Sequence, residues 1–250
     1  MRQEIITRRN LPHWYKPGAI HFVTYRLHGT LPQAVLDDLH AKKESMLAKK
    51  PDNVPVNRHR ETVHKKLFAE YDRYLDRSRE RLWLQDCRIA AIIRGNLYHH
   101  HGTKYCLLAY SVMPNHVHVL LQPIDRSSGG SPEPSETQED SGGPPEVRDE
   151  DIGEQSDGHS PLSSIMHSLK SYTAHEANKV LQRTGEFWQA ESYDHWVRDE
   201  DELERIVNYI AANPVDARLT PKHEDWYYCS CHDRLLMDGT VTGWLGWPTS

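Results

Sequence analysis

The sequence predicts an α+β protein in which helices lie on one face of an antiparallel sheet. Three observations lead to this class. Segments rich in β-branched and aromatic residues alternate with longer segments of helical periodicity. Two strand-like segments follow each other with only a Met-Pro turn between them. The chain has 250 residues, of which 37% are hydrophobic, and this length suits one large domain or two small ones.

The first half of the chain predicts one strand followed by three helices. Residues 19–27 are β-branched and aromatic and are bounded by a Pro-Gly pair and by Gly29, which is typical of a strand. Residues 51–58 form a Pro- and Asn-rich break. Apolar residues at helical spacing indicate helices over 31–48, 61–77 and 88–101.

The second half adds a hairpin, a long helix, a short strand and a capped helix. The expected elements are strands over 104–112, 115–122 and 193–197 and a helix over 162–182. Asp199 and Glu202 form a capping box at the start of the last helix. We expect that helix to run to Ala212 and to stop at Asn213 and Pro214.

The net charge of −6 hides an uneven distribution. Residues 1–123 carry 20 Lys and Arg against 11 Asp and Glu, a balance of +9, and residues 124–160 carry 2 against 11, a balance of −9. Residues 161–250 carry 8 against 14, a balance of −6. An acidic segment therefore masks a basic N-terminal half, so the total charge does not exclude a nucleic-acid partner.

Residues 124–160 consist mainly of Gly, Ser, Pro, Glu and Asp. Such a segment cannot offset its ordering entropy by burial, which predicts a disordered acidic insert. It is either a plain linker or a segment that competes with DNA phosphates for the basic face. It divides the chain into an N-terminal part (1–123), a second part (161–220) and a C-terminal tail (221–250).

Cysteine content and hydropathy indicate the compartment. Four cysteines are too few and too scattered for a disulfide scaffold. The first residues contain no apolar run typical of a secretory signal, and no segment approaches the roughly 18 apolar residues that span a membrane. We therefore expect a cytoplasmic protein.

The sharpest chemical signal is a histidine pair on the second hairpin strand. Because side chains alternate along a strand, His116 and His118 point to one face while Val117 points to the other, into the core. Two imidazoles side by side on a sheet can hold a divalent metal ion. With 17 histidines in the chain, a chance pair exposed to solvent is about equally compatible with the sequence.

A hydroxyl group and a carboxylate share one side of the helix expected over 162–182. Tyr172 and Glu176 are four residues apart, so they lie one turn apart. A free phenol is a weak nucleophile, and a cation bound at the scissile phosphate would assist it. Taken alone, Tyr172 is more typical of a half-buried aromatic residue on an amphipathic helix than of a nucleophile.

Three segments in combination resemble a known family. The strand MPNHVHVLLQP, the helix SLKSYTAHEAN and the segment GEFWQAESYDHWVRDEDELERIVNYIAANPVDARL resemble the REP-associated tyrosine transposases. These are single-tyrosine HUH transposases related to the insertion-sequence-200 type. The resemblance covers roughly residues 8–122 and 161–219. It implies a ferredoxin-like (RRM-like) fold, with extra helices in this chain.

The resemblance also implies a site and a reaction. His116 and His118 match the metal-binding pair, and Tyr172 matches the nucleophile. Glu176 stands where the family places a third metal ligand, whose residue type varies. The implied metal is Mg²⁺ or Mn²⁺. Such enzymes cut one DNA strand, leaving a 5′-phosphotyrosyl bond and a free 3′-hydroxyl group, and a second 3′-hydroxyl group can reverse the step. The implied substrates are single-stranded or hairpin DNA from palindromic repeats, bound by a monomer or a homodimer.

Two other functions fit the same residues. One is a domesticated DNA-binding protein that keeps the fold without turnover. The other is an unrelated metallohydrolase that uses the histidine pair and makes no covalent intermediate.

Candidate DNA contacts lie in three parts of the chain. Arg8 and Arg9 could form a flexible arm that reaches DNA phosphates. Arg26 could lie on the sheet face, and Lys170 is two residues before the proposed nucleophile. Trp188 could stack on an unpaired base. A solvated arm, a solvent-facing lysine and a core tryptophan are the plainer interpretations.

Overall fold

The computed structural model describes residues 16–124 and 160–234, and its centre is one four-stranded sheet. The strands are β1 (His21–Arg26), β2 (Tyr105–Val112), β3 (His116–Pro123) and β4 (Tyr193–Trp196). They are ordered β2-β3-β1-β4, and all neighbouring strands are antiparallel. This order, with helices between β1 and β2 and between β3 and β4, is that of the ferredoxin-like fold. The predicted α+β class is confirmed.

The helices begin close to the positions that the sequence predicts. Their bounds are α1 (Gln33–Ala48), α2 (Val56–Arg77), α3 (Cys87–His99), α4 (Pro161–Val180), α5 (Glu200–Asp216) and the short α6 (Ser230–Asp233). Two 3₁₀ turns, η1 (Trp83–Gln85) and η2 (His223–Asp225), complete the described elements. Side chains cap three of the helices: Asp86 caps α3, Ser160 caps α4 and Asp199 caps α5.

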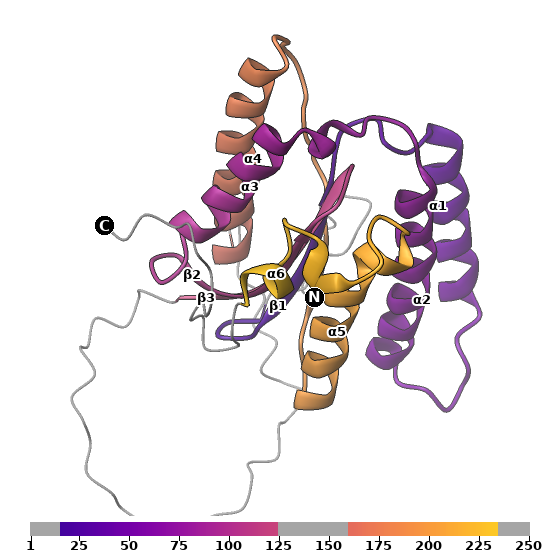
Figure 1. Ribbon diagram of the computed structural model, residues 1–250. Coiled ribbons are helices and arrows are strands. Elements are labelled where there is room, and N and C mark those ends of the chain that lie inside the picture. Colours follow the sequence, from indigo (N-terminus) through magenta and orange to yellow (C-terminus); the bar gives the residue numbers. More distant parts are fainter. Residues whose placement is uncertain (1–15, 125–159, 235–250) are drawn as a thin grey trace, which may run out of the picture.

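Helices α3 and α4 cover one face of the sheet, as expected (Figure 1). Val117 and Val119 of β3 point into this layer, where they meet Ile93 of α3 and Leu169 of α4. The alternation inferred for the histidine strand is therefore correct.

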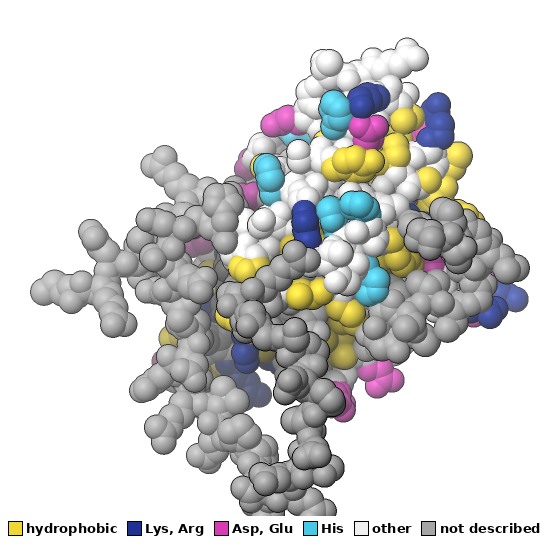
Figure 2. Space-filling model, turned by 90° about the vertical axis from the view of Figure 1, so that its left-hand side faces the viewer, with side chains coloured by type: hydrophobic (Ala, Val, Ile, Leu, Met, Phe, Trp, Pro, Cys, Tyr) yellow, Lys and Arg dark blue, Asp and Glu magenta, His cyan; other side chains and the backbone are white. Residues whose placement is uncertain are grey.

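Figure 2 shows the side that α3 and α4 occupy in Figure 1, where other histidine side chains are spread over the surface.

The extra helices cover the opposite face, so the sheet lies between two helical layers (Figure 1). Phe22 of β1 and Leu120 of β3 pack there with Phe68 of α2 and with Ile210 of α5. Helix α1 lies on the outer side of α2 (Figure 1) and has no buried residue. The consequence for the site is that His116 and His118 lie under α2 and α5, completely buried, and not on an open sheet surface.

Two helix boundaries differ from the expected ones. Helix α2 begins at Val56, inside the expected break, because Pro55 directly precedes it and the fixed φ of proline suits the start of a helix. Helix α5 continues past Pro214 to Asp216. Proline removes one backbone donor there, but the last turn is still closed by the bond from the Ala217 amide to the Asn213 carbonyl, 2.9 Å long.

The described part of the C-terminal tail packs against the edge of β2. Cys229 forms an isolated antiparallel bridge with Ser111, and the Val112 amide donates to the Tyr228 carbonyl at 2.9 Å. Residues 226–233 therefore belong to the folded unit. The basic arm at Arg8 and Arg9 and almost all of the acidic insert lie outside the described residues.

Among the helices of the described ranges, none combines the length and the apolar character needed to cross a membrane.

Candidate active site

The histidine pair is placed by strand pairing. His118 of β3 pairs with Thr24 of β1, and His116 pairs with Arg26. Partners directly opposite on a sheet share a face, so all four side chains point towards α2 and α5. Helix α2 brings a carboxylate, that of Asp72, to the same position.

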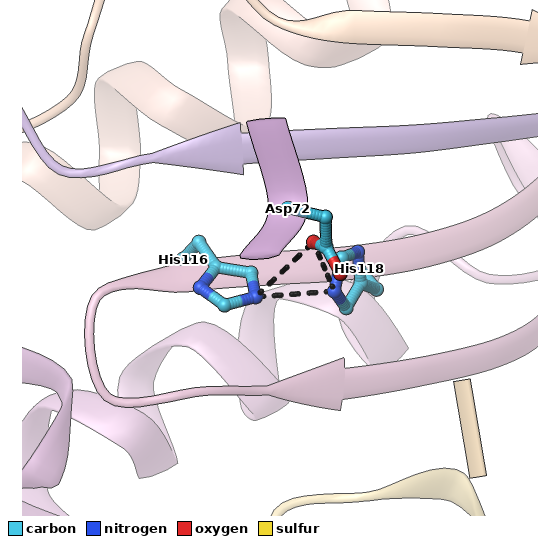
Figure 3. A group of neighbouring side chains, drawn as sticks. All are labelled: Asp72, His116 and His118. Atoms are coloured by element: carbon cyan, nitrogen blue, oxygen red, sulfur yellow. Dashed lines mark hydrogen bonds and ion pairs between the residues drawn. The ribbon is translucent and has the colours of Figure 1, made fainter. Parts of the chain in front are cut away.

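Three potential metal-binding atoms converge at this point (Figure 3). The Nε2 atoms of His116 and His118 are 3.1 Å apart. Asp72 Oδ1 is 3.4 Å from His118 Nε2 and 3.9 Å from His116 Nε2. These are the only three His, Cys, Asp or Glu residues in the described ranges that form such a group.

The remaining ring nitrogens are held by neighbouring polar side chains. His116 Nδ1 is 2.6 Å from Asn115 Oδ1, and the Asn115 amide nitrogen in turn donates to the Leu75 carbonyl at 2.9 Å. Because that amide oxygen can only accept, it favours the tautomer with a proton on His116 Nδ1. Thr24 Oγ1 is 2.7 Å from His118 Nδ1. This leaves the Nε2 lone pair of His116 available. A polar partner on the other ring nitrogen, as both histidines have here, is common around metal-bound histidines.

The electrostatics of the group fit a divalent cation. Burial, followed by the neighbouring His118, lowers the pKa of His116 to about 3. Burial likewise lowers the pKa of His118 to about 3, so both imidazoles are neutral at pH 7. Burial raises the pKa of Asp72, and its Oδ1 atom is buried without a hydrogen-bond partner. Two nitrogen lone pairs and a carboxylate oxygen facing one another repel unless a cation lies between them.

A tyrosine from α5 completes the group. Tyr209 donates its hydroxyl hydrogen to Asp72 Oδ2, and its ring centroid is 5.4 Å from that of His118. The Asn213 amide nitrogen, one helical turn later, donates to the Tyr209 oxygen at 3.2 Å. Burial, followed by the Asp72 carboxylate, raises the pKa of Tyr209 well above its usual value. The buried Oδ1 atom of Asn213 has no hydrogen-bond partner.

The structure does not bring Tyr172 or Glu176 to the histidines. Helix α4 packs on the opposite face of the sheet through Leu169, Thr173 and Ala177. Tyr172 is 53% exposed, and Glu176 is paired with Lys179 at 2.8 Å. The expected meeting of these two residues with the imidazoles is therefore corrected: Tyr209 and Asp72 lie there in this structure.

Three of the other expected DNA contacts, Arg26, Lys170 and Trp188, interact with neighbouring parts of the protein in this structure. Arg26 lies on the histidine face but is buried, and its Nη1 atom donates to the Leu27 carbonyl at 3.4 Å. The Lys170 ammonium donates to the carbonyls of Gln189 and Ala190, both at 3.1 Å. Trp188 is buried and packs in the hydrophobic core, which is the plainer of the two interpretations.

A small pocket adjoins the buried group. This pocket reaches His116 and is lined by Asp76 and Ser78 of the α2 end, by Arg79, and by the turn at Asn115. Burial and the carboxylates of Asp72 and Asp216 raise the pKa of Asp76 to about 7.

A local signal for Tyr209 exists in the sequence. Tyr209 and Asn213 have the same four-residue spacing as Tyr172 and Glu176. The apolar residues around Tyr209, such as Ile206 and Ile210, indicate a position at the edge of the buried stripe of the helix. Spacing alone could not choose between the two tyrosines, because the choice depends on which helix covers the histidine face.

Comparison with known proteins gives one sequence relative and one structural neighbour. No family model matches the chain. A protein of Haemophilus influenzae, named "Putative REP-associated tyrosine transposase", is 30% identical over 71 residues, which are 28% of this chain and 40% of that protein. The match thus spans less than half of the relative's length.

The structural neighbour is described as "Structure of the REP associates tyrosine transposase bound to a REP hairpin". It is 14% identical and aligns over 96% of this chain and 92% of that chain, with a TM-score of 0.47. The sequence relative confirms that this chain resembles the REP-associated tyrosine transposases.

Proposed function

We propose that the protein is a metal-dependent enzyme that nicks and joins single DNA strands at hairpin-forming palindromic repeats, in the manner of a REP-associated tyrosine transposase. The observation that carries the proposal is the convergence of His116, His118, Asp72 and Tyr209 in one buried group. The resemblance to the transposase relative supports the choice of DNA as the substrate.

His116, His118 and Asp72 would hold the metal ion, and the Asn213 amide oxygen is a further candidate ligand. An ion bound there would polarise the scissile phosphate and stabilise the charge that develops on it. Imidazole ligands favour transition metals over Mg²⁺, so this set of ligands points to Mn²⁺ as the better of the two expected ions.

Tyr209 takes the role of nucleophile in this proposal, in place of Tyr172. Its oxygen would attack the phosphorus atom, and its proton would pass to Asp72 Oδ2, which already accepts that hydrogen bond. The bond from phosphorus to the 3′-oxygen breaks, and this oxygen takes up a proton. A 5′-phosphotyrosyl bond and a 3′-hydroxyl group result, and attack by another 3′-hydroxyl group reverses the step and joins the strands.

The test is a covalent-adduct assay with a hairpin oligonucleotide that carries single-stranded flanks, in the presence of Mn²⁺. We expect a protein–DNA adduct on denaturing gels for the wild type and for Tyr172→Phe, and none for Tyr209→Phe. His116→Ala should bind the hairpin without forming the adduct. Thermal unfolding of each variant checks that the fold is intact.

The alternatives give different results. Binding without an adduct in the wild type would indicate a DNA-binding protein without turnover. Metal-dependent cleavage that persists in Tyr209→Phe and Tyr172→Phe would indicate a metallohydrolase. An adduct that is lost only in Tyr172→Phe would restore the role expected from the sequence and reject Tyr209.

A further inference from the structure

We propose that Arg81 and Arg183, both held against the indole of Trp83, bind backbone phosphates of a single-stranded DNA flank that leads out of the candidate active site. The partner named here rests on the proposed function. The geometry of the arginine pair and the charge around it are independent of that function.

Two guanidinium groups lie against one aromatic ring. The central carbon of the Arg183 guanidinium is 4.4 Å from the Trp83 ring centroid, and that of Arg81 is 5.0 Å away. Phe187 stacks on Trp83 with a centroid distance of 5.6 Å and an interplanar angle of 23°. Contact with an indole orients both guanidinium planes and leaves their N–H groups free to point outward.

Within residues 16–124 and 160–234, no acidic side chain forms an ion pair with either guanidinium group. Arg183 donates to Asn178 Oδ1 at 2.7 Å and to the Glu186 carbonyl at 3.2 Å, and both acceptors are neutral. The Glu186 carboxylate itself faces His28 Nδ1 at 3.0 Å. Arg81 makes no hydrogen bond or ion pair with the described residues. Two cations held against one ring, with no acidic partner in the described part of the chain, form a site for an anion with several acceptor oxygens.

The backbone at Arg81 is built around this arrangement. Arg81 has a φ of 52°, in the left-handed region that L-residues seldom adopt. Gly29 has a φ of 72°, and a Cβ atom at that position would be 2.7 Å from Arg81 Nε. The missing side chain at Gly29 therefore leaves the space that the Arg81 guanidinium occupies.

Exposed arginines lie along the chain between α2 and the pair, beside a pocket that also contains the Asp76 carboxylate. Arg79 lines the pocket that reaches His116. Two residues of extended chain, at most about 7 Å, separate it from Arg81. Arg73, Arg77 and Arg79 are exposed, and like Arg81 they have no acidic partner among the described residues. A phosphate backbone that leaves the pocket would meet Arg79 first and then the Arg81–Arg183 pair.

The experiment measures binding of fluorescent oligonucleotides by anisotropy, in the presence of EDTA so that no cleavage occurs. Three oligonucleotides are compared: the hairpin alone, the hairpin with a 5′ flank, and the hairpin with a 3′ flank. The variants are Arg81→Gln, Arg81→Lys and the double variant Arg81→Gln, Arg183→Gln. Arg60→Gln is the matched control, because this exposed arginine lies about 25 Å along the axis of α2 from Arg77, the last residue of that helix.

We expect the two Gln variants to weaken binding of one flanked hairpin, irrespective of flank sequence, with little change for the hairpin alone. The slope of log affinity against log salt should fall by about 0.7 for each phosphate contact removed from a single strand. Arg81→Lys should retain part of the affinity, and Arg60→Gln all of it. The Arg81 side chain has no hydrogen bond to a described residue, so we expect the single variant to keep the thermal midpoint of the wild type, which is measured first.

Unchanged affinity in the double variant, or an equal loss for the hairpin without flanks, would overturn the inference. The result is separable from that of the proposed function. A wild type that forms the Tyr209 adduct while the double variant binds normally rejects only the phosphate site. A wild type that forms no adduct, with flank binding lost in the double variant, rejects only the enzymatic function.

Discussion

Tyr209 donates its hydroxyl hydrogen to Asp72, whose other carboxylate oxygen faces both imidazoles of the histidine pair. One carboxylate thus connects the candidate nucleophile to the candidate metal ligands. A metal ion bound on Oδ1 would withdraw electron density from Asp72, and the proton on Tyr209 would have an acceptor already in place on Oδ2. This relationship makes Asp72, and not a residue of α4, the centre of the predictions about metal binding.

Removing the carboxylate of Asp72 should weaken metal binding. For Asp72→Ala we expect affinity for Mn²⁺, measured by calorimetry or by the EPR signal of free Mn²⁺, to fall by more than the roughly 10–100-fold typical of lost outer partners. Glu176→Ala is the matched control, because its carboxylate is paired with Lys179 on the other side of the sheet. Equal losses in the two variants would contradict this set of ligands.

The metal-free protein should lose stability in acid. The pKa of His116 and His118 is about 3 in the folded state and about 6.5 when exposed. The unfolded chain therefore binds more protons between these values, and the free energy of unfolding decreases as pH falls from about 6.5 towards 3. Urea titrations with a chelator, over a series of pH values, measure this slope.

Asp76 acts in the opposite direction within an overlapping range. Its pKa is about 7 when folded, against 3.8 as the reference value, so its contribution to stability is present in acid and is lost as pH rises from about 4 to 7. Asp76→Asn should therefore steepen the acid loss. A free energy of unfolding that is flat between pH 4 and 6.5 in Asp76→Asn would count against neutral buried histidines.

The C-terminal segment should contribute to global stability through a buried ion pair. The Arg94 and Asp233 side chains are 8% and 1% exposed, and Tyr98 also donates to Asp233, at 2.9 Å. Removing one partner of a buried pair leaves the other charge uncompensated, at a cost of about 3–5 kcal/mol. Asp233→Ala should lower the urea midpoint accordingly. Arg88→Ala, which removes an exposed partner of Asp86, is the control and should change it little. A small effect of Asp233→Ala would mean that the tail is dispensable for the fold.

Deleting residues 126–158 should preserve the fold, because the closure entropy of a loop grows only slowly with its length. The deletion removes most of the acidic insert (124–160), whose charge balance is −9. We therefore expect hairpin affinity at low salt to rise or to stay unchanged. Anisotropy titrations at two salt concentrations measure this. A large fall in affinity would show that the insert contributes to binding.

The sequence predicts the strands and helices well because their signals are local. Alternation placed His116 and His118 on one face, and the capping box at Asp199 placed the start of α5. Bonds within a turn or a strand pair determine such features. The sequence of the segment between Pro51 and Val56 was less informative, since a proline can interrupt a helix or begin one.

The partners of the histidines could not be predicted because they depend on helix packing across the sheet. Asp72 of α2 and Tyr209 of α5 are 137 residues apart in sequence. Both tyrosine candidates lie on amphipathic helices with a polar residue four positions later. Only the layer on which each helix packs separates them, and that is a property of the assembled fold.

The parts of the candidate site are synthesised in a fixed order, because they lie at different points along the chain. Both imidazoles and Asp72 precede residue 120, whereas Tyr209 lies on the last long helix of the described chain. A polypeptide that stops before α5 would carry the atoms that could hold an ion but not the phenol of Tyr209. Chains left unfinished by the ribosome would therefore lack the candidate nucleophile.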